Sequence, residues 1–109
     1  MAIPDSVLVF TTLPVDTDVA AFARSLVEER LAACVNLLPP MESVYRWEGR
    51  VERETERQLI IKTTRDRTMS LWERVRELHP YEVPEFVVVA IGDGNDAYLR
   101  WIGESTRER

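Results

Sequence analysis

The most constraining feature of this sequence is a β-strand pattern that is longer than the domain that contains it. The pattern covers residues 51–64 and follows an earlier strand across the tight turn Glu48-Gly49, where Gly49 supplies a positive φ. A strand of about 13 residues, at about 3.3 Å per residue, is about 43 Å long. A globule of 109 residues has a diameter of only about 34 Å. We therefore expect this hairpin to extend beyond its own domain.

The outer half of the hairpin, residues 46–57, is rich in charge. A free ribbon exposes unpaired backbone groups, and charged side chains alone can protect a solvated arm from aggregation. Tyr45 and Trp47, however, lie on the same side of the strand as Ser43, and aromatic residues are enriched at interfaces. We therefore favour docking of the hairpin on a neighbouring subunit. Arms exchanged around a closed ring predict a cyclic oligomer.

The other predicted elements alternate between strands and helices. Apolar residues predict strands, and residues at helical spacing predict amphipathic helices. The predicted elements are a strand at 6–12, a helix ending near Ala33, a strand at 34–47, a helix from Thr68 to His79-Pro80, a strand at 86–91 and a helix after Asn95.

Several residues predict where these elements begin, end or bend. Asp16 or Thr17 is the expected cap of the first helix, and Thr68 that of the second. Pro39-Pro40 predicts a bulge or an edge position, because proline donates no hydrogen bond to a neighbouring strand. Strand 86–91 is expected to be buried. Tyr98, Trp101 and Ile102 are expected on the inner face of the last helix.

The resulting order, β-α-β-β-α-β-α, is the split βαβ pattern of ferredoxin-like folds. It predicts the α+β class, with an antiparallel sheet and its helices on one face. A chain of 109 residues without repeats or linkers suits a single domain, residues 1–109.

Charge and composition narrow the expected partners. The net charge of −5 argues against a nucleic-acid partner. The sequence contains no apolar run of the roughly 20 residues that cross a bilayer, so no membrane association is expected. Cys34 is the only cysteine, and we find no signal-peptide pattern. A cytoplasmic location is therefore expected.

Five stretches of the chain, in this order and spacing, resemble the CutA family of divalent-cation tolerance proteins. The resemblance extends over nearly the whole chain. The stretches are LAACVN at 31–36, SVYRWEG at 43–49, LIIKT at 59–63, HPYEVPE at 79–85 and DAYLRWI at 96–102.

The resemblance implies a homotrimer of ferredoxin-like subunits, similar to the PII signalling proteins, in which long hairpins extend each sheet into the next subunit. It implies ligand sites at clefts between subunits. It also implies a role in the response to metal ions, with copper, Cu(II), or another divalent cation as the bound metal. The expected protein is non-enzymatic. There are two alternatives to this function. One is a PII-like signalling or docking module, and the other is an enzyme with its active site in the cleft.

His79 and Cys34 are the candidate metal ligands. His79 is the only histidine, and its alternative role is to cap the preceding helix. Cys34 is a soft ligand for copper, but a cysteine at a helix-to-strand junction is more often a small buried apolar residue. Some relatives carry cysteine in place of Thr11 and a second histidine in place of Leu78, so this chain departs from them at both positions.

Five residues match positions that line the cleft in the CutA family: Tyr45, Trp47, Lys62, Tyr81 and Glu85. Lys62 is the only lysine, whereas 13 of the 14 basic residues are arginine. With Tyr81 and Glu85 it could bind an anion or transfer protons, which is the basis of the enzyme alternative. The same residues could instead form a hydrogen-bond network that only stabilises the trimer.

Overall fold

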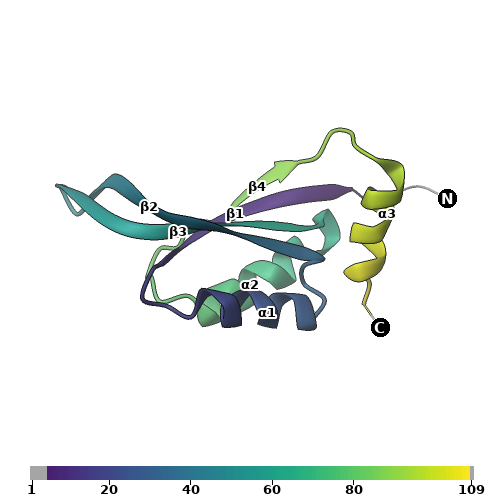
Figure 1. Ribbon diagram of the computed structural model, residues 1–109, viewed down its shortest axis with the longest axis horizontal. Coiled ribbons are helices and arrows are strands. Elements are labelled where there is room, and N and C mark those ends of the chain that lie inside the picture. Colours follow the sequence, from purple (N-terminus) through teal and green to yellow (C-terminus); the bar gives the residue numbers. More distant parts are fainter. Residues whose placement is uncertain (1–4, 109) are drawn as a thin grey trace.

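The computed structural model describes residues 5–108, and these residues form a four-stranded sheet with three α-helices (Figure 1). The order of the elements agrees with the prediction. The elements are β1 (Ser6–Pro14), α1 (Val19–Glu28), β2 (Cys34–Trp47), β3 (Arg50–Thr64), the 3₁₀ turn η1 (Arg65–Arg67), α2 (Thr68–Leu78), β4 (Val87–Ala90) and α3 (Asp96–Ser105).

The four strands form one antiparallel sheet in the order β2-β3-β1-β4. The connection through α1 leads from β1 to the edge strand β2, and β3 then fills the position between them. The connection through α2 carries the chain past β1, so that β4 lies on its other side. This arrangement is the split βαβ topology. The predicted α+β, ferredoxin-like fold with an antiparallel sheet is therefore confirmed.

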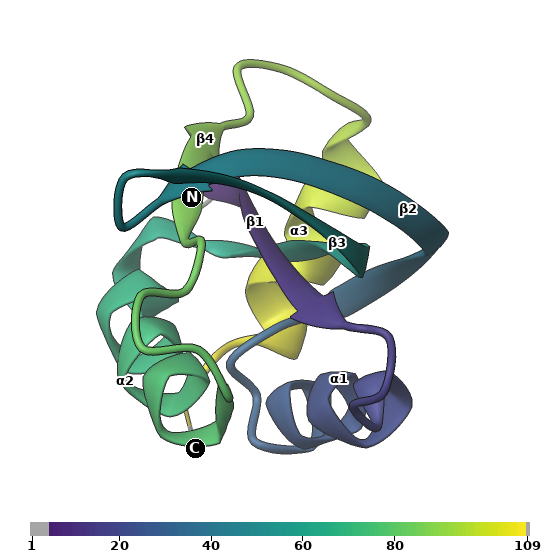
Figure 2. The ribbon, with the colours of Figure 1, turned by 90° about the vertical axis from the view of Figure 1, so that its left-hand side faces the viewer.

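Helices α1 and α2 lie side by side against one face of the sheet (Figure 2). Successive side chains of a strand point to opposite faces, so alternate residues of β1 and β3 contact these helices. The core at this contact is mainly apolar. Its completely buried members are Val7, Val9, Leu13, Leu26, Leu59, Ile61, Leu71 and Val75.

Helix α1 is shorter than predicted. Its N-cap is Asp18, whose side chain accepts a hydrogen bond from the Ala21 amide, rather than Asp16 or Thr17. The helix ends at Glu28 and not near Ala33, because Arg30 adopts a φ of 61° and reverses the chain. The apolar residues after Arg30 continued the helical spacing in the sequence, but they pack as a turn rather than a helix.

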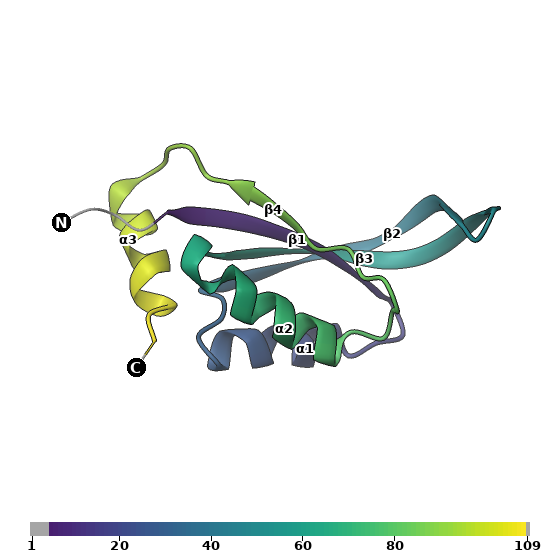
Figure 3. The ribbon, with the colours of Figure 1, turned by 180° about the vertical axis from the view of Figure 1, so that it is seen from behind.

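The hairpin of β2 and β3 projects beyond the helices, as predicted (Figures 1 and 3). The molecule measures 50 × 25 × 23 Å, and the hairpin lies along the longest axis. A register shift between Leu37 and Pro40 forms the expected bulge. The turn at the tip has positive φ at both Glu48 and Gly49, 48° and 78°, which matches the twist of the two strands.

Three predictions for the second half of the chain are wrong in detail. Thr68 is the first residue of α2 rather than its cap, because the η1 turn precedes it. Strand β4 is exposed rather than buried, since it is an edge strand whose only neighbour among the described strands is β1. Helix α3 does not join the other helices but crosses the end of the sheet where β1 begins (Figure 1). Of the three residues expected on its inner face, Ile102 is fully buried as predicted, whereas Tyr98 and Trp101 are 41% and 43% exposed.

Candidate functional site

A groove of ≈ 620 Å³ lies between the hairpin and the loop that joins α2 to β4. Figure 3 shows this loop passing beside the base of the hairpin. Four of the five predicted cleft residues line the groove, namely Tyr45, Trp47, Tyr81 and Glu85. The remaining lining residues are Thr12, Ser43, Glu52, Glu54, Glu56, Pro80, Glu82 and Val83.

Strand alternation directs the hairpin residues into the groove. Ser43, Tyr45 and Trp47 are two residues apart on β2 and therefore share one face. On β3, Glu54 pairs with Ser43 and Glu52 pairs with Tyr45, so these carboxylates occupy the same face as the aromatic side chains. The predicted common orientation of Ser43, Tyr45 and Trp47 is thus confirmed, and the facing strand adds a row of glutamates.

The loop side of the groove is held by His79, which is 8% exposed. Its Nε2 lies 2.7 Å from the Thr12 carbonyl oxygen, and its Nδ1 accepts a hydrogen bond from the Tyr81 amide at 3.1 Å. Because the carbonyl can only accept, Nε2 carries the proton and the ring is neutral. Burial lowers the pKa of His79 below its ordinary value of 6.5, although the Thr12 carbonyl and Glu56 act in the opposite direction.

Tyr81 and Glu85 connect the loop to the sheet through hydrogen bonds. The Tyr81 hydroxyl donates to Oε2 of Glu56 at 2.7 Å. Burial, followed by this bond to Glu56, raises the pKa of Tyr81 far above its ordinary value of 10.0, so the phenol stays protonated. Nε2 of Gln58 donates to Oε2 of Glu85 at 2.8 Å and to the Thr11 carbonyl at 2.8 Å. These contacts give the groove a rigid wall.

The fifth predicted cleft residue, Lys62, lies outside the groove of its own chain. It is six residues from Glu56 along β3, which corresponds to about 20 Å. Its Nζ donates to the Tyr98 hydroxyl at 3.2 Å and lies 5.5 Å from the centre of the Tyr98 ring. A single chain therefore does not assemble Lys62 with Tyr81 and Glu85.

The two candidate metal ligands also lie apart. Cys34 begins β2 and pairs with Lys62, whereas His79 contacts Thr12, which pairs with Gln58. Lys62 and Gln58 are four residues apart on β3, or about 13 Å. Both nitrogens of the His79 ring are engaged, so neither offers a free lone pair. Within residues 5–108, no three histidine, cysteine or acidic side chains are grouped to hold a metal ion.

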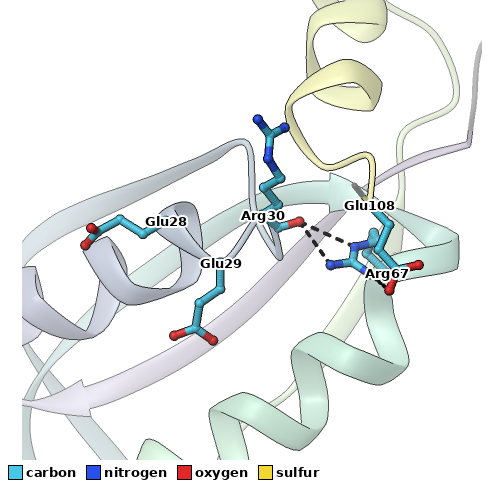
Figure 4. A pocket seen from close by; sticks show the side chains of 5 residues that line it. All are labelled: Glu28, Glu29, Arg30, Arg67 and Glu108. Atoms are coloured by element: carbon cyan, nitrogen blue, oxygen red, sulfur yellow. Dashed lines mark hydrogen bonds and ion pairs between the residues drawn. The ribbon is translucent and has the colours of Figure 1, made fainter.

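A second hollow, of ≈ 540 Å³, lies where the end of α1 approaches the C-terminal segment (Figure 4). Arg67 contacts the Arg30 carbonyl at 3.4 Å and the Glu108 carboxylate at 3.6 Å, while the guanidinium of Arg30 points away. Glu29 is paired with Arg74 at 2.9 Å. Because most charged side chains that line this hollow are paired within the chain, we interpret the hollow as a structural junction.

Sequence reasoning missed the acidic character of the groove. Glu52, Glu54 and Glu56 occur at every second position of β3, on the same face of the hairpin as Tyr45 and Trp47 of β2. This period of two was visible in the sequence, but the pairing register that places it beside the aromatic residues was not. None of the helices within residues 5–108 is both long and apolar enough to span a membrane.

Comparisons with known proteins agree with this architecture. The family model described as "CutA1 divalent ion tolerance protein" matches residues 7–105. A divalent-cation tolerance protein CutA from Thermus thermophilus is 48% identical over 99 residues, which cover 91% of this chain and 96% of the relative.

Solved structures show the same similarity. CutA1 from Oryza sativa superimposes with a TM-score of 0.93 at 43% identity, and the match covers 98% of both chains. A CutA from Archaeoglobus fulgidus, described as a periplasmic divalent cation tolerance protein, gives a TM-score of 0.89 at 31% identity over 94% of this chain and 99% of its own. The chain therefore belongs to the CutA1 family of divalent ion tolerance proteins.

Proposed function

We propose that this protein is a non-enzymatic homotrimer in the response to divalent metal ions, and that it binds a small ligand in the groove beside the hairpin. The observation that carries the proposal is the unsupported outer half of the hairpin. Val44 and Val51, on the side opposite the groove, are 67% and 68% exposed. A two-stranded ribbon on its own is marginally stable in water, so a neighbouring copy is the natural support.

The uncovered face of the sheet offers the matching surface. Leu8 pairs with Val89 and Phe10 pairs with Val87, so these side chains share the face opposite the α1–α2 core. Val87 and Val89 are 50% and 40% exposed, and β4 leaves one backbone edge unpaired in the described chain. An exposed apolar face beside an open edge is suited to pairing with another copy of the hairpin.

Light scattering on the purified protein tests the trimer. Introducing charge on the outer hairpin, with Val44→Glu and Val51→Glu together, should dissociate it. Met69→Glu is the matched control, because Met69 is 75% exposed on α2, away from both surfaces. A folded, stable single chain in the unmodified protein at working concentration would contradict the proposal.

The enzyme alternative receives less support from the groove. An enzyme of this kind would need Lys62, Tyr81 and Glu85 close together. Within one chain, however, Lys62 contacts Tyr98 instead. The trio could meet only if Lys62 came from a neighbouring copy. Turnover of any metabolite that Lys62→Arg abolishes, in a variant that keeps its oligomeric state, would favour the enzyme over the binding protein.

We propose Cu(II) as the divalent metal ion to which this protein responds. A metal ion at His79 would have to displace the contact with Thr12 or with Tyr81, so we expect weak binding at this residue. Native mass spectrometry with Cu(II) should show a defined stoichiometry that decreases in His79→Gln or Cys34→Ser. A random series of adducts, equal in all three proteins, would remove both residues from the proposal.

We infer a cytoplasmic location from Cys34 as the only cysteine, since disulfides are rare in reducing compartments. The location needs an experimental test, because the relative from Archaeoglobus fulgidus is described as periplasmic. Cell fractionation with an antibody against the native protein distinguishes the two locations.

A further inference from the structure

The chemistry of the groove beside the hairpin points to one class of ligand. Its walls include three aromatic side chains, Tyr45, Trp47 and Tyr81. Tyr45 and Trp47 are 38% and 42% exposed, so part of each ring is free for contact. Aromatic faces attract cations such as ammonium and guanidinium groups, and this attraction strengthens when water is excluded.

The charge of the groove has a single sign. Five glutamates line it, and its lining residues include neither arginine nor lysine. Of these glutamates only Glu52 forms an ion pair among residues 5–108, an exposed contact of 3.8 Å with Arg50. The groove therefore has an unbalanced negative charge, which a bound cation would neutralise.

Glu56 shows this imbalance most clearly, because the residue is only 6% exposed. Its Oε2 accepts the Tyr81 hydroxyl, yet no ion pair with arginine or lysine occurs in the described part of the chain. A buried carboxylate without a cation is costly, and buried charges in proteins are normally paired. Glu56 thus offers the groove a carboxylate that has no cationic partner within residues 5–108.

The form of the groove favours a molecule over a metal ion. A metal ion requires several ligands that converge on one point, and no described group of three acidic, histidine or cysteine side chains does so. The carboxylates are instead distributed over a volume of ≈ 620 Å³, within the range that encloses small organic ligands.

We propose that this groove binds an organic cation, namely an amine, guanidinium or quaternary ammonium group carried on a small apolar body. The cationic group contacts Glu54 and Glu56, and the apolar body lies against Tyr45 and Trp47. This inference rests on the proposed function, because a neighbouring copy in the trimer would complete the open side of the groove.

Isothermal titration calorimetry with choline, with agmatine and with the uncharged carbon isostere of choline tests the proposal. The isostere keeps the shape of choline and removes only its charge. Choline or agmatine should bind at least about fivefold more tightly than the isostere. Glu56→Gln and Trp47→Leu should each weaken binding of the cation by a similar factor. Glu28→Gln and Trp101→Leu, outside the groove, are the matched controls and should bind as the unmodified protein does.

Light scattering on every sample separates this inference from the proposed trimer. Loss of Glu56 could disturb folding, so Glu54→Gln provides a second, more exposed substitution in the same groove. A trimer that binds the isostere as tightly as choline, or binds neither cation, overturns the cation assignment and leaves the proposed trimer intact. A crystal structure of the trimer in which Lys62 or an arginine of a neighbouring copy fills the groove would overturn it in the same way.

Discussion

The hydroxyl of Tyr81 donates a hydrogen bond of 2.7 Å to Oε2 of Glu56, and this contact joins the loop after α2 to the middle of the long strand β3. Glu56 is buried, and the pKa of Tyr81 is raised, chiefly by burial and then by this hydrogen bond. The pair therefore connects the loop side of the groove to the sheet. Its geometry leads to the first prediction.

Tyr81→Phe should lower the free energy of unfolding by about 1–3 kcal/mol, because it removes a donor from a buried carboxylate. Tyr98→Phe is the control: Tyr98 is 41% exposed, so water can replace its contact with Lys62 and the loss should be below about 0.5 kcal/mol. Denaturant unfolding at one fixed protein concentration measures both variants. Equal losses would show that the contact of Tyr81 with Glu56 contributes no more to the free energy of unfolding than the exposed contact of Tyr98 with Lys62.

The neutral state of His79 predicts a pH dependence of stability. Burial lowers the pKa of the folded state below the ordinary value of 6.5, so the unfolded chain binds a proton more readily. This contribution to stability is complete above the unfolded pKa and is lost as the pH falls toward the folded pKa. Glu56, which favours the charged ring, limits the effect without reversing it.

Thermal unfolding between about pH 8 and about pH 5 measures this dependence. The midpoint of the unmodified protein should decrease more steeply on acidification than that of His79→Gln, which has no titrating ring. Identical slopes for the two proteins would show that His79 has the same pKa in the folded and unfolded states.

Thr11 provides a prediction of increased stability. It is fully buried in β1, and its Oγ1 has no hydrogen-bond partner among the described residues. Thr11→Val keeps the shape of the side chain and should raise the free energy of unfolding by about 1 kcal/mol. Thr63→Val is the matched control, since the Thr63 hydroxyl donates to the Leu31 carbonyl at 2.8 Å. The two substitutions should therefore act in opposite directions, and a loss of stability in both would contradict the prediction.

Arg30 ends α1 in a left-handed conformation, with a φ of 61°. Glycine adopts this conformation without steric cost, so Arg30→Gly should raise the free energy of unfolding by up to about 1 kcal/mol. The Arg30 carbonyl that contacts Arg67 is kept in the variant. Glu29→Gly, at a φ of −84°, should instead be destabilising. Denaturant titration compares the two, and a loss in Arg30→Gly would indicate that its side chain contributes more than the strain costs.

The sequence by itself determined the order of the elements, the length of the hairpin and the common side of Ser43, Tyr45 and Trp47. These properties are local, because they follow from the period of apolar residues, from turn residues such as Gly49 and from the fixed rise per residue of a strand. The resemblance carried by five short stretches added the family, which the comparisons confirmed.

Only the tertiary structure decided which of these elements meet. The register of β2 on β3 brings Glu52 and Glu54 beside the aromatic side chains, and the loop after α2 brings Tyr81 to Glu56. The tertiary structure also places Lys62 against Tyr98 of α3, away from the groove. Such contacts join residues far apart in the chain, and their energies depend on burial and on neighbours that no local pattern specifies.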